Sequence, residues 1–432
     1  MTAPHPQTRA RPPRPTAGLG GRTWTALVII GLVGQLAWTV ENMYLNVFVY
    51  DVITPQPEAI ALMVASSAVA ATVGAIIVGA WSDRSGRRRV FVAAGYVLWG
   101  ACTAAFGLVG EPDGVASGVV GAMTAIIVLD CVMSFIGSGA NDAAFMAWVT
   151  DSTTPSNRGR VDGMLAVLPL VAMLLVFGLL DGLTRAGDWG VFFAVVGALT
   201  AVAGGASLLL MRDRPVPRSG ERVFASIRHG FRPSSVRRNP GLYLTLLTCA
   251  VIGTSSQVFL PYVIIYLQRY LRIEAYALVL GVVLIAASLL SILGGRVMDR
   301  VGKERFLLPS VGVFAAGLLA MPFAHEPVWV IAAATVMMTG MMASLATVNA
   351  LVRDRTPAER AGAVQGLRMI LGVMVPMILG PTIGAAVISG AGTTFEQLGV
   401  VQPVPGPQIF VAAAVVLLAG PAVWAWARRA SA

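Results

Sequence analysis

Acidic side chains stand inside stretches of sequence that are otherwise apolar, and these residues could do chemistry. Asp130 lies within the apolar run 115–149, and Glu41 lies within the run 24–50. An ionised carboxylate in such surroundings is costly without a cation. No Lys or Arg stands at a matching depth in the first half of the chain, so Asp130 is expected to exchange a proton. The alternative is a permanently neutral acid that hydrogen-bonds a neighbouring carbonyl group.

A stripe of polar residues accompanies Glu41. At 100° per residue, one helix face holds Gln35, Thr39, Asn42 and Asn46. Such a stripe is expected to face a wet cavity. Glu41 falls about 130° away from it, so either the helix bends there or Glu41 points between helices. A purely structural hydrogen-bond node is the alternative interpretation.

Other polar residues extend this candidate site. Ser134 and Asn141 share the helix face of Asp130, whereas Asp142 lies about 120° away, where packing or a gate suits it better. In the second half, Gln257 and Tyr262 are better ligand candidates than the serines. Serine hydroxyl groups in such helices mostly hydrogen-bond to their own backbone, whereas an amide and a phenol do not. The predicted ligand and proton-exchange residues are Gln35, Trp38, Glu41, Asn42, Asn46, Asp130, Ser134, Asn141, Gln257 and Tyr262.

The elements that must position these residues are membrane helices. Hydrophobic residues make up 56% of the 432, charged residues only 12%, and mean hydropathy is +0.76. A soluble domain carries about 25% charged residues, so lipid must cover most of this surface. Backbone groups in lipid bond within helices. The apolar runs predict twelve: 24–50, 59–81, 90–109, 115–149, 161–184, 189–211, 241–271, 275–297, 306–324, 327–352, 360–389 and 408–427.

The distribution of charge predicts orientation and domain organisation. The net charge of +10 comes from arginines gathered between alternate apolar runs, which is typical of cytoplasmic loops and does not indicate a nucleic-acid partner. We expect a multi-pass protein of the cell (plasma or inner) membrane with both termini cytoplasmic. The predicted units are a tail (1–23), a six-helix bundle (24–212), a linker (213–240), a second bundle (241–428) and a short tail (429–432).

Cysteine and histidine usage predicts neither metal binding nor a disulfide framework. The three cysteines are scattered without C-x-x-C spacing, and the three histidines lie far apart. No Walker A or hydrolase motif is present either, so neither an enzyme nor a cofactor is expected. The expected partners are a small molecule, the proton and the lipid bilayer, and the expected oligomeric state is a monomer.

A loop motif occurs once in each half. The loop after the second predicted helix reads GAWSDRSGR from Gly79, and the loop after the eighth reads GRVMDRVGK from Gly295. Both fit G-x-x-x-D-R-x-G-[RK]. A weaker echo starts at Asp151 and Asp354, after the fourth and tenth helices. The chain therefore consists of two parallel six-helix repeats, an arrangement found in secondary transporters with a substrate site between the halves.

This repeat resembles the major facilitator superfamily over nearly the whole chain. The resemblance implies alternating access and a cytoplasmic gate formed by Gly79, Asp83, Arg84, Gly86, Arg87, Asp151, Arg158, Gly295, Asp299, Arg300 and Gly302. It implies that Asp83 and Asp299 face helix N-termini of the opposite half. It also implies that Arg84 and Arg87 pair with acids such as Asp151. A purely topological role for these arginines is the alternative.

A second resemblance concerns the first third of the chain. Gly34-Gln35-x-x-Trp38-x-x-Glu41-Asn42, with residues 81–89, looks like the glycoside–pentoside–hexuronide:cation symporters of the melibiose and sucrose types. It implies a sugar or glycoside carried with a cation. Residues 59–82 lack the acids that bind sodium in melibiose-type members, so a proton is expected rather than sodium. The alternatives are a proton-coupled drug or metabolite efflux antiporter of the same fold and a non-transporting membrane sensor.

Overall fold

The computed structural model describes residues 19–110, 116–154, 157–213, 239–356, 361–397 and 400–429. Within them, twelve helices are long and apolar enough to cross a membrane, and each predicted range overlaps one of them. The mostly helical fold with twelve spans is therefore confirmed. The predicted linker 213–240 and the two tails lie almost entirely outside the described residues.

Helices of the first half follow one another with short connections. They are α1 (Gly21–Thr39), η1 (Val40–Tyr44), α2 (Leu45–Phe48), η2 (Val49–Ile53), α3 (Pro57–Ser85), α4 (Arg88–Ala105), η3 (Phe106–Leu108), α5 (Ala116–Gly137), η4 (Ser138–Phe145), α6 (Met146–Ser152), α7 (Arg158–Leu175), η5 (Val176–Leu180), α8 (Asp181–Arg185) and α9 (Trp189–Leu210). The first, fourth and fifth spans each combine α-helical and π-helical segments.

The second half has the same plan and adds a β-hairpin. Its elements are α12 (Pro240–Phe259), η6 (Leu260–Tyr262), α13 (Val263–Ile265), η7 (Tyr266–Tyr270), α14 (Tyr276–Val301), α15 (Lys303–Ala320), η8 (Met321–Phe323), α16 (Pro327–Asp354), α17 (Ala361–Met369), η10 (Ile370–Met374), α18 (Val375–Gly390), β1 (Thr394–Gln397), β2 (Val400–Pro403), α19 (Gln408–Leu417) and α20 (Ala419–Arg429). The sequence did not predict the antiparallel hairpin, in which Thr394 pairs with Pro403.

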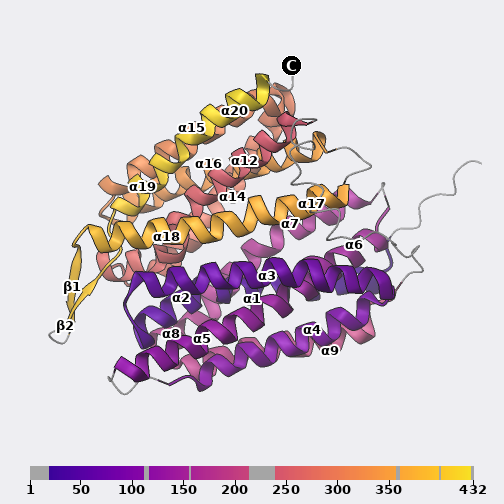
Figure 1. Cartoon of the computed structure of the whole chain (residues 1–432), viewed down its shortest axis with the longest axis horizontal. Helices are drawn as coiled ribbons and strands as arrows, with labels where there is room; N and C mark the ends of the chain where they lie inside the picture. The colour runs from indigo at the N-terminus through magenta and orange to yellow at the C-terminus, as the bar shows by residue number, and fades with distance from the viewer. Residues whose placement is uncertain are drawn as a thin grey trace, which may run out of the picture.

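The two halves form two groups of helices that meet along their length. Figure 1 shows the first half in indigo to magenta and the second in red to yellow, with α18 running alongside α3. The helix ends that carry Arg84–Arg89, Arg158 and Arg300–Arg305 lie at one end of the molecule, here called the arginine-rich face. The hairpin β1–β2 projects at the other end, here called the opposite face.

Glycines allow the close helix contacts within each half. A Cβ atom on Gly74 of α3 would lie 2.2 Å from the carbonyl oxygen of Phe135 in α5. In the second half, Gly380 and Gly384 bring α18 against α12 and η6, where their Cβ atoms would meet Gln257 of α12 and Tyr262 of η6. The glycine and proline sequence at 380–384 therefore forms a packing surface between the seventh and eleventh spans.

Candidate functional site

A cavity of about 340 Å³ lies between the two halves. Four of the predicted ligand residues line it: Gln35, Trp38 and Asn42 from the first span, and Gln257 from the seventh. Thr39, from the predicted polar stripe, lines it as well. Three of the four residues of the predicted stripe therefore face a cavity, and the second half contributes a single amide to the wall.

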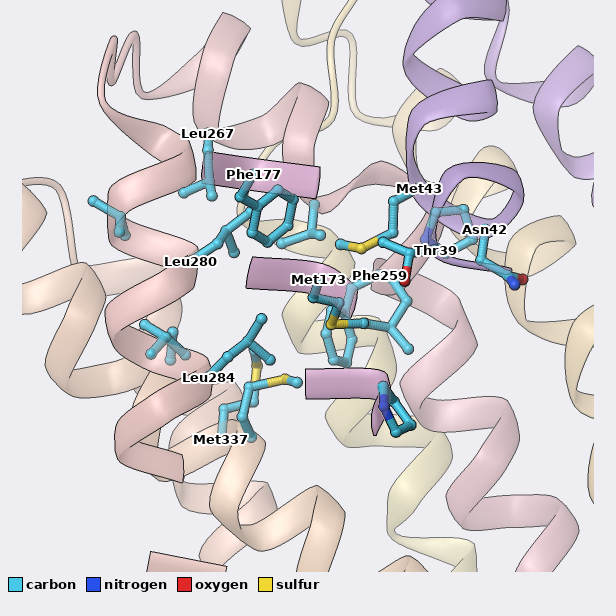
Figure 2. Close-up of a pocket in the computed structure, with 18 of the residues that line it drawn as sticks. Thr39, Asn42, Met43, Met173, Phe177, Phe259, Leu267, Leu280, Leu284 and Met337 are labelled. Carbon is cyan, nitrogen blue, oxygen red and sulfur yellow. The ribbon is translucent and has the colours of Figure 1, made fainter. Parts of the chain in front are cut away.

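Most of the remaining cavity wall is apolar. Five methionines line it, together with leucines and valines of α14 and the aromatic rings of Phe177 and Phe259. Figure 2 shows Thr39 and Asn42 on one side of the cavity and Leu280 and Leu284 on the other, with the thioethers of Met43, Met173 and Met337 between them. The cavity is thus amphipathic, with its hydrogen-bonding groups concentrated on α1 and η1. The sequence did not predict this methionine content, because isolated methionines in apolar helices look like ordinary core residues.

Glu41 and Asp130 lie beside the cavity but are buried in the first half. Ser134 of α5 donates a hydrogen bond of 2.5 Å to Oε1 of Glu41, and Ser67 of α3 lies within hydrogen-bonding range of Asp130. The two acids are only 7% and 1% exposed, and they interact electrostatically. Oε2 of Glu41 and Oδ1 of Asp130 have no hydrogen-bond partner. Three of the predicted residues, Glu41, Asp130 and Ser134, therefore do come together.

A second polar group surrounds Asn141 and Asp142 in η4. Tyr96 of α4 donates a hydrogen bond of 2.8 Å to Oδ1 of Asn141, whose amide nitrogen donates to Asp142. A Cβ atom on Gly34 would lie 2.4 Å from the Tyr96 hydroxyl and 2.6 Å from Asn141. Glycine is therefore required at position 34 for the first span to approach this network. The indole of Trp38 is also within hydrogen-bonding range of Asp142.

Helix geometry explains the position of Glu41. It lies in the π-helical segment η1, and Asn141 and Asp142 lie in the longer π-helical segment η4. A π-helix places residues at a different angular spacing from an α-helix, so projections at 100° per residue fail across it. The Glu41 side chain points between helices, against Ser134 of the fourth span, which is one of the two outcomes expected from the sequence.

Two predicted ligands make structural contacts instead. The Tyr262 hydroxyl is buried and donates to the carbonyl oxygens of Pro57 and Pro381 at 3.1 and 3.0 Å, so it joins the two halves away from the cavity wall. Asn46 is fully buried, and its amide nitrogen donates to the carbonyl oxygen of Asn42. Neither lines the cavity in this conformation.

Charged residues at the arginine-rich face join helices within one half. Arg88 contacts both Asp83 and Asp151, the latter at 2.9 Å. The sequence pointed to Arg84 and Arg87 as partners of Asp151, but both are exposed, whereas Arg88 opens α4 and points back between the two acids. The second half repeats the arrangement through Lys303 with Asp354 at 2.5 Å and Arg355 with Glu304 at 2.8 Å.

The glycines of the repeated motif differ in what they do. Gly86 and Gly302 both have positive φ, 66° and 91°, and each ends a span, which explains a glycine at this position in both loops. A Cβ atom on Gly79 would lie 3.2 Å from Ala143, whereas Gly295 has open space around it. The other predicted gate residues Arg158, Asp299 and Arg300 are exposed. The expected contact of Asp83 and Asp299 with the opposite half stays a prediction.

Polar contacts between the halves lie at the opposite face. Arg269 forms an ion pair with Asp51 at 2.7 Å, and Tyr276 donates a hydrogen bond to buried Asp181. Tyr50 donates to the Pro403 carbonyl oxygen at 2.9 Å, and Ser389 donates to Glu58. Sequence reasoning missed these residues because they stand at helix ends, where charged and aromatic residues are common in any membrane protein.

The comparisons with known proteins agree with this architecture. The family model described as Major Facilitator Superfamily matches residues 27–381 and, in a second match, residues 256–432. No curated protein matches the chain.

Solved structures similar to the chain include a mutant of the nucleoside transporter NupG, at TM-score 0.70 and 13% identity over 93% of this chain and 99% of that one. A bacterial homologue of the human lysosomal transporter Spinster, inward-facing and occupied, matches at 0.70 and 15% identity over 96% and 98%. A POT family transporter in complex with 5-aminolevulinic acid matches at 0.66 and 13% over 95% and 97%. At these identities the likeness concerns the fold.

Proposed function

Since the chain belongs to the Major Facilitator Superfamily, and is thus a membrane transporter rather than an enzyme, we propose that it carries a small amphipathic solute coupled to protons. The cavity between the halves is the observation that carries this proposal. Its volume of about 340 Å³ suits a small molecule, and its position at the junction of the two repeats is where substrates of this fold bind.

The lining of the cavity supports a solute with an apolar body and a hydrogen-bonding end. Gln35, Asn42 and Gln257 offer amides that both donate and accept hydrogen bonds, and Trp38 offers an indole surface. Methionine, leucine and valine side chains make up much of the remainder of the wall. These side chains cannot form hydrogen bonds with the many hydroxyl groups of a free sugar. A glycoside with an apolar aglycone is therefore the form of the expected sugar substrate that suits this lining.

Proton coupling is supported by the buried acids of the first half. Glu41 has one oxygen that accepts from Ser134 and another without a partner, and Oδ1 of Asp130 also lacks a partner. A buried carboxylate oxygen without a partner is costly when ionised, and a proton on it removes the charge. The described ion pairs include none with either acid. We therefore assign these two carboxyl groups to proton exchange.

The orientation of the molecule follows from the positive-inside rule. The arginine-rich face is assigned to the cytoplasm, because Lys and Arg accumulate in cytoplasmic loops of membrane proteins. The described polar contacts between the halves lie at the opposite face, so we take this conformation to be closed toward the outside. The cavity then exchanges its solute with the cytoplasm in this state.

Efflux by proton antiport is the second candidate. The apolar cavity wall favours it, because a pocket lined by methionine and leucine side chains accepts varied lipophilic molecules. Membership of a transporter family favours both candidates over a non-transporting sensor. The direction of transport distinguishes symport from antiport.

Transport by the purified protein in liposomes tests the proposal. We expect a radiolabelled aryl glycoside to accumulate under an imposed proton gradient, and the parent free sugar to accumulate less. Gln257→Ala should reduce this uptake, whereas Gln268→Ala, an amide at the opposite face outside the cavity, should not. Accumulation driven by a sodium gradient without any response to pH would contradict proton coupling. Extrusion of the glycoside against its gradient would instead select the antiporter.

A further inference from the structure

Polar side chains recur at every fourth position of the fourth span: Asp130, Ser134, Ser138 and Asp142. Residues four apart are neighbours on a helix surface, so these side chains form a ridge that runs through α5 into η4. Asp130, Ser134 and Ser138 are at most 1% exposed, whereas Asp142 is exposed. The ridge thus connects one accessible carboxyl group with a buried one.

Hydrogen bonds already join the members of this ridge to the proton-exchanging acids. Ser138 donates to Oδ2 of Asp142 at 2.9 Å, and Ser134 donates to Oε1 of Glu41 at 2.5 Å. Oε2 of Glu41 and Oδ1 of Asp130 are buried and lack partners, so each can receive a proton. Neither of these acids is accessible enough to take a proton from water by itself.

We propose that Asp142 and Ser138 form the port through which protons reach Glu41. The proposal rests on the proton coupling proposed above and adds its route. A hydronium ion at the exposed Asp142 gives a proton to its carboxylate and is left as a water molecule. Asp142 passes it to the Ser138 hydroxyl, whose own proton crosses to Ser134 through an intervening water molecule, since the described hydrogen bonds include none between the two serines. Ser134 accepts that proton and releases its own to Glu41, which gains one proton. Each serine is a neutral hydroxyl group again at the end of the transfer.

The surroundings of Asp142 suit a group that gains and loses protons. Glu41 faces it from η1, and Tyr96 faces it from α4 through Asn141. The α3 helix, which also packs against η4, has no titratable residue between Ala59 and Ser82. The described ion pairs include none with Asp142, so no cation holds it permanently ionised.

Trp38 connects this port to the solute cavity. Its side chain lines the cavity, and its indole lies within hydrogen-bonding range of Asp142. A solute that moves the indole therefore changes the surroundings of the Asp142 carboxyl group. Asp142 is itself exposed, so the proton that the route requires can reach its carboxyl group from water.

Deuterium exchange of the buried carboxyl groups tests this route without any solute. The full-length protein in lipid is transferred to D2O, and infrared absorption follows the carbonyl band of the protonated acids, assigned through Glu41→Gln and Asp130→Asn. Asp142→Asn and Ser138→Ala should each slow the exchange by about 10²-fold, the low end of what a positioned proton-transfer group contributes. Asp142→Glu should restore the exchange rate.

Matched controls separate the port from general effects of substitution. Ser66→Ala removes a hydroxyl from a half-buried position of α3 outside the ridge, and Asp162→Asn removes an exposed carboxyl from α7, so both should leave the exchange rate unchanged. Unchanged exchange in both Asp142→Asn and Ser138→Ala would overturn the port while leaving proton coupling in place. Absence of a band from Glu41 or Asp130 at every pH would overturn the proposed coupling, and the port with it.

Discussion

The unpartnered oxygens of Glu41 and Asp130 lead to a prediction at the scale of single residues. Asp130→Asn should abolish accumulation of solute under a proton gradient, because the variant carries no exchangeable proton at this position. Exchange of labelled for unlabelled solute should continue, since it needs no net proton movement. Both are measured in the same liposomes at several pH values.

The corresponding variant of the second acid is Glu41→Gln, which should keep the hydrogen bond from Ser134 through its amide oxygen. A structural role for either acid would remove accumulation and exchange together and lower the yield of folded protein. Full accumulation by both variants would exclude proton exchange at this pair.

Arg88 gives a second prediction at this scale. It is 13% exposed and contacts two acids, so Arg88→Gln leaves Asp83 and Asp151 without their cation. We expect the free energy of unfolding to fall by about 1–3 kcal/mol, because hydrogen bonds to charged groups contribute about that much when partly buried. Thermal unfolding in detergent measures the loss. Arg87→Gln, at an exposed neighbouring position, should unfold at the wild-type temperature.

At the scale of elements, the contact between α3 and α5 depends on the absence of a side chain at Gly74. An added Cβ atom would lie 2.2 Å from a backbone oxygen of Phe135, so the helices must separate in Gly74→Ala. We expect destabilisation of about 1–3 kcal/mol, as for other overpacked sites. Gly295→Ala meets no atom within 4 Å and should be neutral or slightly stabilising, because alanine favours helices. Equal stability of the two variants would contradict this packing.

The helices themselves could be predicted from sequence, because a membrane span needs only a long apolar run. The repeated loops were recognisable for a related reason. Gly86 and Gly302 end spans with positive φ, a conformation that restricts the residue type at both positions. The spans and the span-ending glycines each depend on a requirement of a short segment, either its hydrophobicity or its backbone conformation. A single sequence shows such requirements directly.

Other features depend on geometry that residue spacing does not carry. The π-helical segment at Glu41 is defined by its backbone hydrogen bonds, which the spacing of residues in the sequence does not show. Arg88 rather than Arg87 reaches Asp151 because α4 begins there and turns that side chain inward. Tyr262 contacts the first half only because the two halves meet at the opposite face, and the sequence does not indicate which face is closed.

At the scale of the whole molecule, polar contacts at one face hold the two halves together. The pair Asp51 and Arg269 is one of them, and both side chains are largely buried. Asp51→Asn combined with Arg269→Gln should shift the population toward a state open at that face, because each polar contact stabilises the closed state. A cysteine introduced at Gln268, in the polar pocket of the same face, should then react faster with a membrane-impermeant maleimide.

The control for this experiment is Asp188→Asn, which removes an exposed carboxyl group at the same face without a described contact to the second half. Its labelling rate should match that of the parent cysteine variant. If the double variant also labels at the parent rate, the ion pair does not stabilise the closed face.

The burial of Glu41 and Asp130 within the membrane also has an electrical consequence. When one of these groups is ionised, the conformational change of the empty carrier moves a negative charge across part of the membrane potential. When the proton is bound, the group is neutral and the same conformational change moves no charge. A transmembrane potential of 100 mV contributes about 2.3 kcal/mol for each elementary charge that crosses the membrane. For an uncharged solute, each cycle then displaces net charge, so voltage drives transport alongside the difference in pH.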